Sequence, residues 1–287
     1  MHRHTKPIIA LLLLSSCLVY SSCNHGKDQS KAYLEDAQEA IRDARWDEAK
    51  VMAELALEDH EDHREAREIL AHIHRGQAEV AREAGELSIA YQHHADAGAA
   101  EPSRMLRAKD YLAAVTLGME IGRPADELAP LAEQSTMADP TSLSAHLLAA
   151  QLWEDTTEPE RAIDHYLWAW AADPGQLQTG LRLGILYLGA QRFWDAAGVL
   201  GQILESDPQN VQAAVNRADA LEQVRDPHGA RQVYEDILTH YPDNSAILFR
   251  YAGFLERQGE LRSSERMRDK ARDTMPGVER RQLRELR

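Results

Sequence analysis

Prolines recur at a fixed distance over the second half of this 287-residue sequence. Proline has no backbone N–H and restricts the residue before it, so it ends a helix. Aspartates suited to a turn directly precede three of these prolines, at positions 139, 173 and 207. A period held over four intervals constrains the fold strongly. The prolines, each thirty-four residues from the next, are Pro140, Pro174, Pro208, Pro242 and Pro276.

Small residues recur with the same period, at two matched places in each block. A small residue midway along each of two helices lets their backbones approach closely. Large apolar residues spaced by three or four fill the rest of each block, which is the period of a one-sided helix. Each block therefore predicts two helices and two turns, and blocks must stack because none can bury its apolar face alone. The small residues are Ala150 and Ala162, Gly184 and Ala196, Ala218 and Ala230, and Ala252 and Ser264.

The block at Leu177–Asn210 resembles the tetratricopeptide repeat (TPR), through Leu183-Gly184, Tyr187, Ala196, Leu200 and Pro208 in order and spacing. The resemblance implies an all-α fold, a right-handed α-solenoid of about seven antiparallel helix pairs. Four regular repeats are expected over residues 143–278. They are Leu143–Gln176, Leu177–Asn210, Val211–Asn244 and Ser245–Val278.

The flanking segments are expected to extend the same architecture. Residues 30–142 read as degenerate repeats, the first at Ser30–His63 without its proline. In the next repeat the break between helices falls at either Gly76 or Gly85. Arg123-Pro124 supplies a turn between two later helices. Residues 279–287 are predicted to form a polar helix that caps the stack.

The N-terminus predicts export and lipidation. A short basic start precedes an apolar run too short for a confident membrane span, which is typical of a secretory signal over residues 1–23. Leu14-Ser15-Ser16-Cys17 resembles the bacterial lipobox, so Cys17 is the favoured acylation site and Cys23 the alternative. Residues 24–29 then form a polar tether. By resemblance, acyl chains would hold the protein at the periplasmic side of a membrane, the outer one favoured.

The sequence offers no convincing active site. It lacks the P-loop, nucleophile-elbow, H-E-x-x-H and C-x-x-C patterns. We therefore expect no enzyme, no catalytic residue and no cofactor. The net charge of −15 argues against a nucleic-acid partner, which needs a basic stripe over phosphates.

Histidines crowd into the first repeats, where His60 and His63 would share a helix face. Spacing alone gives no set of three or four ligands. On a helix, the side chains of His72 and His74 point in different directions, and so do those of His93 and His94. The prediction is that no metal site is present. A metal-responsive module in these repeats is kept as an alternative.

A binding groove is the main functional prediction. In the family that the sequence resembles, the first helix of each pair lines the concave face, and partners lie along it. Matched positions in the four regular repeats give an apolar row beside an acidic one, suited to a peptide with apolar and basic side chains. An alternative is that the apolar row only helps repeats to pack. The groove residues are Leu147, Gln151, Glu154, Leu181, Ile185, Leu188, Val215, Asp219, Glu222, Phe249 and Glu256.

Together these features predict a non-enzymatic scaffold for protein–protein interaction, lipid-anchored and facing the periplasm. Its partners would be envelope or secreted proteins of a secretion, pilus, outer-membrane or exopolysaccharide system, as the resemblance implies. A second alternative is an accessory subunit, or a weak hydrolase, in envelope glycan metabolism. The sparse aromatic residues of the predicted groove argue against that sugar-binding alternative.

Overall fold

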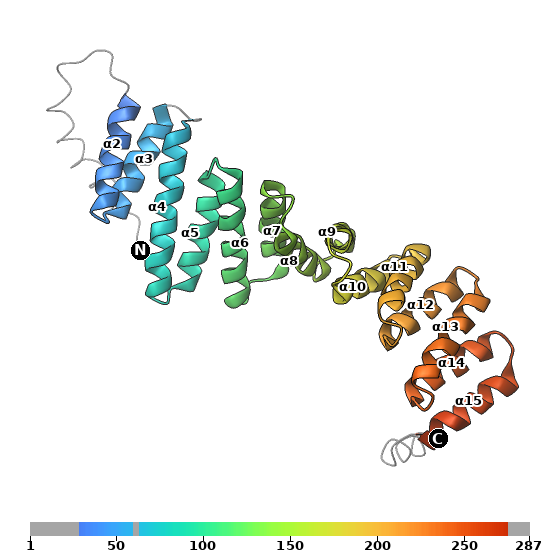
Figure 1. Cartoon of the computed structure of the whole chain (residues 1–287). Coiled ribbons are helices and arrows are strands. Elements are labelled where there is room, and N and C mark those ends of the chain that lie inside the picture. The colour runs from blue at the N-terminus through green and yellow to red at the C-terminus, as the bar shows by residue number, and fades with distance from the viewer. Residues whose placement is uncertain (1–28, 60–62, 275–287) are drawn as a thin grey trace, which may run out of the picture. The chain divides into compact units, whose positions relative to one another are not determined.

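The chain is described by a computed structural model over residues 29–59 and 63–274. Every regular element in those residues is an α-helix, and the fourteen helices follow one another in sequential pairs (Figure 1). Within the same residues, no helix combines the length and apolar character needed to cross a bilayer. The helices are α2 (Gln29–Arg42), α3 (Trp46–Asp59), α4 (Arg64–Glu83), α5 (Leu87–Ala100), α6 (Arg104–Glu120), α7 (Ala125–Ala138), α8 (Leu143–Glu154), α9 (Pro159–Ala172), α10 (Leu177–Gly189), α11 (Phe193–Ser206), α12 (Val211–Gln223), α13 (Pro227–His240), α14 (Ser245–Arg257) and α15 (Leu261–Thr274).

Contacts divide the chain into two units, residues 1–121 and 122–287. Helices α2–α6 belong to the first unit and α7–α15 to the second. Within each unit, helices adjacent in sequence pack on each other; α6 packs on α5, and α7 packs on α8. The turn at Arg123-Pro124 is confirmed, but the helices that it joins fall in different units.

The predicted all-α fold of paired helices is confirmed. Helices α8, α10, α12 and α14 begin at Leu143, Leu177, Val211 and Ser245, where the four regular repeats were predicted to start. Pro276, the signal, both cysteines and the capping helix lie outside the described residues, and so does the predicted tether except for Gln29, which is the first residue of α2. The domain boundaries therefore stay predictions.

The aspartates before the periodic prolines form the same turn three times. The Oδ1 atoms of Asp139, Asp173 and Asp207 accept hydrogen bonds from the backbone N–H groups two residues on, at 3.1, 3.1 and 3.2 Å. Such a turn satisfies an N–H that would otherwise lack a partner at the helix end. The following helix then starts at a fixed place, which explains why the period is kept so strictly.

The matched small residues lie at the helix contacts, as predicted. All of those named are buried, and Gly184 shows why size matters there. A Cβ atom at Gly184 of α10 would lie 2.7 Å from Leu200 Cδ2 of α11. That distance is well inside van der Waals contact, so the close approach of the pair depends on the missing side chain.

The break in the second repeat falls at Gly85, which has φ of +78° between α4 and α5. This left-handed conformation carries little cost for glycine and a steric cost for other residues. Gly76 instead lies inside α4, where a Cβ atom would be 2.4 Å from the Trp46 ring. Its role is close packing, not a turn.

Candidate functional site

The predicted groove residues all lie on the first helices of the regular repeats. Helix α10 packs on α12, and α12 packs on α14, so matched positions of these three helices lie on neighbouring helices. Helix α8 carries Leu147, Gln151 and Glu154; α10 carries Leu181, Ile185 and Leu188; α12 carries Val215, Asp219 and Glu222; α14 carries Phe249 and Glu256.

The rows differ in how much surface they offer. In the first row Leu181 is only 6% exposed, and Leu147, Val215 and Phe249 are half-buried, so this row mainly packs repeats together. In the second row Ile185 is 37% exposed and Gln151 is also exposed. The second row is therefore the more accessible to a partner.

The acidic residues of these rows are paired with arginines from other helices. Glu154 of α8 accepts from Arg182 Nη1 of α10 at 2.8 Å. Glu222 of α12 receives a two-pronged contact from Arg257 of α14, with both nitrogen–oxygen distances at 2.7 Å. Because the pairs link successive first helices, we call Arg182, Arg250 and Arg257 the arginine ladder.

Two further contacts neutralise the rest of the acidic row. Asp219 lies 3.4 Å from Arg250 Nη1, and Glu256 pairs with Arg268 of α15. The expectation of an open acidic row therefore needs revision, because a basic partner would have to compete with these arginines. The reason is one of spacing: arginine side chains are long enough to span neighbouring first helices.

A hollow of about 620 Å³ opens beside the ladder. Its lining combines two apolar side chains, Leu188 and Phe193, with amide and charged groups from α12 and α14. Three predicted groove residues meet in it. Its lining is Leu188, Gln191, Phe193, Asp219, Glu222, Gln223 and Arg257.

Asp219 is a half-buried carboxyl group that lines this hollow. Its burial raises its pKa above the ordinary value, and the neighbouring Glu222 adds to the rise, while Arg250 and Arg257 oppose it. A partly desolvated carboxylate is a strong acceptor for a donor that displaces water. The hollow can therefore bind a donor-bearing side chain next to an apolar one.

The histidine-rich first repeats are arranged differently from the sequence expectation. His63 is the N-cap of α4, where its Nδ1 accepts a hydrogen bond from Ala66 N–H at 3.4 Å. His63 therefore lies at the start of α4, and the predicted shared helix face with His60 stays untested. His60 itself lies outside the described residues.

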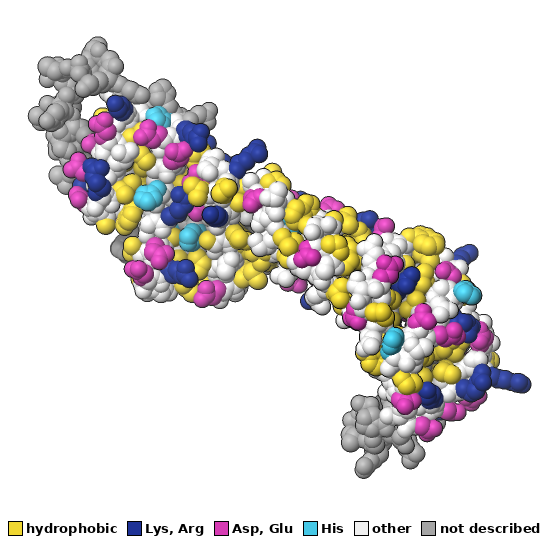
Figure 2. Space-filling model, in the orientation of Figure 1, with side chains coloured by type: hydrophobic (Ala, Val, Ile, Leu, Met, Phe, Trp, Pro, Cys, Tyr) yellow, Lys and Arg dark blue, Asp and Glu magenta, His cyan; other side chains and the backbone are white. Residues whose placement is uncertain are grey.

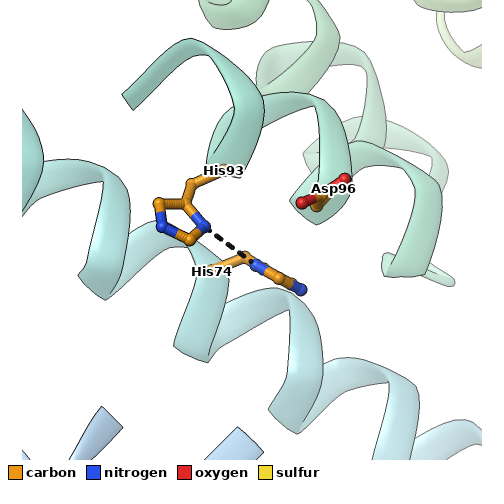
Figure 3. A group of neighbouring side chains, drawn as sticks. All are labelled: His74, His93 and Asp96. Carbon is orange, nitrogen blue, oxygen red and sulfur yellow. Dashed lines mark hydrogen bonds between the residues drawn. The ribbon is translucent and has the colours of Figure 1, made fainter. Parts of the chain in front are cut away.

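Instead, histidines from two different helices meet. His74 of α4 and His93 of α5 approach with an Nδ1–Nδ1 distance of 3.3 Å, and Asp96 lies one turn further along α5 (Figure 3). One ligand atom from each of the three lies within 4.8 Å of the others. Spacing along one helix could not reveal this cluster, since the pair forms only when α4 and α5 pack.

A second histidine pair lies in the other unit. His146 of α8 and His165 of α9 have an Nδ1–Nδ1 distance of 3.0 Å, and His146 stacks on Trp168. The Pro140 carbonyl oxygen, 3.3 Å from His146 Nε2, can only accept, so Nε2 carries the proton. His165 Nδ1–H then donates to His146 Nδ1, and the pair is a satisfied hydrogen-bond chain.

Sequence reasoning also missed a buried ion cluster in the first unit. Arg75 of α4 donates from Nε and Nη2 to Asp110 of α6, at 2.9 and 2.7 Å, and from Nη2 to Glu101 in the connecting loop. The carboxylate side chains are only 7% and 2% exposed. Acidic residues are so frequent in the sequence that nothing marked these two out.

Charge of both signs is mixed over the face of the two units that Figure 2 draws. On the face drawn in Figure 2, Lys and Arg side chains alternate with Asp and Glu and form no continuous stripe over the described residues.

Comparison with known proteins supports a repeat architecture. The tetratricopeptide repeat family profile matches residues 211–254, which hold α12, α13 and most of α14. No curated protein matches the sequence.

Similar solved structures include several of MamA. MamA MSR-1 is 20% identical, with a TM-score of 0.49, and the match covers 59% of this chain and 97% of that chain. A double mutant of MamA RS-1 is 11% identical, with a TM-score of 0.50, over 58% of this chain and 93% of that chain. At these identities the likeness concerns the fold alone. The family profile thus identifies one tetratricopeptide repeat, at residues 211–254, and the paired helices of the other described residues have the architecture of such repeats.

Proposed function

We propose that this protein is a non-enzymatic scaffold that binds segments of partner proteins along the first helices of its regular repeats. The observation that carries the proposal is the hollow beside the arginine ladder, where Leu188 and Phe193 lie next to Asp219 and Glu222. Such a surface suits an extended or helical segment that alternates apolar and donor-bearing side chains.

The charge of the hollow favours a basic side chain in the partner. Asp219 and Glu222 outnumber Arg257 among its lining residues, and Arg257 is more than half exposed. The looser pair, Arg250 with Asp219 at 3.4 Å, is the one that a basic side chain of a partner can replace at the smaller cost, because Arg257 holds Glu222 through two contacts. The exposed Ile185, on the same helix as Leu188, would extend the apolar contact.

The binding face can be tested by site-specific photocrosslinking in cells. A photoreactive residue at Gln223, which lines the hollow, should give discrete adducts, whereas one at the exposed Gln232 of α13 should give none. Ile185→Glu should remove the adducts. The control variant Leu167→Glu places the same charge at a comparably exposed position of α9 and should keep them. Equal adducts from both crosslinking positions, or adducts that survive Ile185→Glu, would exclude this face.

We also propose that the scaffold is anchored by acyl chains at the periplasmic side of the cell envelope, with envelope proteins as partners. The support is the sequence around Cys17, with Cys23 as the alternative acceptor. Two or more acyl chains hold a protein on a bilayer far more durably than one.

Intact mass of the membrane-bound protein tests the anchor and the choice of cysteine together. The expected mass is that of a chain starting at Cys17 plus its acyl groups, and Cys17→Ala should leave the signal uncleaved. An unacylated, soluble mature chain would refute the proposed anchor and would leave the proposed binding groove unaffected.

A further inference from the structure

The cluster of His74, His93 and Asp96 in the first unit has the composition of a metal site. We propose that these three side chains bind one divalent transition-metal ion of the Zn²⁺ class, held between α4 and α5. Imidazole nitrogen and carboxylate oxygen are ligands that Zn²⁺ and its neighbours accept readily. This function is separate from the groove, which lies in the other unit.

The distance between the two imidazoles fits a shared ion. Zn–N bonds are about 2.0–2.1 Å, so two nitrogens on a tetrahedral ion lie about 3.3 Å apart. His74 Nδ1 and His93 Nδ1 are 3.3 Å apart. The two imidazoles share a hydrogen bond at this distance, as Figure 3 shows, and a bound ion would replace that bond without moving the nitrogens apart.

Asp96 supplies the third ligand from the same face of α5 as His93. Residues three apart on a helix are neighbours on its surface, and Figure 3 shows the carboxylate beside the imidazole pair. Asp96 Oδ1 accepts a hydrogen bond from Gln92 Nε2 at 3.0 Å, the kind of second contact that orients a ligating carboxylate. Because the ligand atoms spread over as much as 4.8 Å, the Asp96 side chain would rotate toward the nitrogens on binding.

The protonation of the imidazoles favours binding at neutral pH. Burial lowers the pKa of His74 to about 4, and burial also lowers the pKa of His93. Neutral imidazoles bind a metal through an unprotonated nitrogen, so the one proton between the two Nδ1 atoms has to move to Nε2 and no net proton is released. Of the charged groups that face it, Asp47 and Asp96 favour a cation and Lys50 of α3 opposes one.

An ion can reach the cluster from solvent. His93 is half-buried and lines a hollow of about 550 Å³, together with Trp46, Gln77 and Ile89. Three protein ligands with an open side leave a fourth position for water or for a side chain of a partner. The metal would then link the two helices of this hairpin and present an exchangeable site at the hollow.

The His146–His165 pair provides an internal control. Among the described residues, His74, His93 and Asp96 are the one group of three metal-binding side chains that lie close enough to share an ion. In the control pair, the Pro140 carbonyl and the Trp168 ring fix His146, and its Nδ1 is already an acceptor.

The test is calorimetric titration of the full-length chain with ZnCl₂, with Cys17 and Cys23 replaced by serine so that thiolates do not bind the metal. Circular dichroism first confirms that each variant is folded. We expect one saturable site per chain, weakened at least about ten-fold by His93→Gln and by Asp96→Asn, and unchanged by His165→Gln.

The proposal would be overturned by the absence of saturable binding, by binding that is unchanged by His93→Gln, or by binding that is lost in His165→Gln. If Asp96→Asn alone left the affinity unchanged, the carboxylate would not be a ligand and the three-ligand site would also be refuted.

Discussion

The buried ion cluster around Arg75 gives the sharpest prediction for the stability of the first unit. One guanidinium faces two carboxylates, Asp110 and Glu101, whose side chains are 7% and 2% exposed. Arg75→Met would keep the apolar stem and remove the charge. The two carboxylates would then lie buried together with no cation between them.

The expected cost follows from this geometry. Breaking a buried ion pair by removing one partner typically costs about 3–5 kcal/mol, because an uncompensated buried charge remains. Asp110→Asn should cost much less, about 1–2 kcal/mol, since Arg75 keeps its pair with Glu101 and the amide can still accept a hydrogen bond. Asparagine and aspartate have nearly the same size, so the difference in lost stability between Arg75→Met and Asp110→Asn measures charge compensation.

Amide hydrogen exchange provides a local readout in α4, α5 and α6. A loss of about 3 kcal/mol corresponds to roughly 150-fold faster exchange for protons released by opening of this unit. Amides of α12–α14, in the other unit, should be unaffected. If Arg75→Met accelerated exchange less than about five-fold, or if Asp110→Asn matched it, charge compensation would not be what holds these helices.

Three further perturbations follow from other contacts. Gly184→Ala should destabilise by about 1–3 kcal/mol because the new Cβ meets Leu200, whereas Gly198→Ala on α11, with open space around it, should stabilise by about 0.5–1 kcal/mol; urea unfolding measures both. The pKa of His74 is lowered by burial from 6.5 to about 4, so its contribution to stability is fully present above about pH 6.5 and lost as the pH falls through 4. With a chelator present, the free energy of unfolding of the first unit should fall by up to about 3 kcal/mol between pH 6.5 and 4. His74→Asn should flatten this pH dependence, and an equal loss in both proteins would contradict the role of His74. Asn244→Ala removes the side chain that caps α14 and should cost about 1 kcal/mol, and no change in unfolding would show that the cap contributes nothing.

The repeat architecture was predictable because it depends on local chemistry. Prolines mark the helix ends, aspartates form the turns before them, and small residues mark the helix contacts. These signals act within one block of sequence, so α8, α10, α12 and α14 begin where the sequence indicates. Where the signals weaken, as at Gly76 and Gly85, only the structure separates a packing glycine from a turn glycine.

The candidate sites were less predictable because they depend on pairs of residues from different helices. The groove residues follow from position in the repeat, yet nothing in the sequence shows that Arg257 reaches Glu222 thirty-five positions away. Likewise, the division of α6 and α7 between two units is a matter of packing.

For this protein, the linear order of residues determined that helices form, where they end and that they pair. Packing alone decided which side chains meet: His74 with His93, Arg75 with Asp110, and the arginine ladder with its carboxylates. The physical reason is range. Helix ends and turns are set by neighbours a few residues apart, whereas a meeting between helices depends on their rotation and register, which many weak contacts set together.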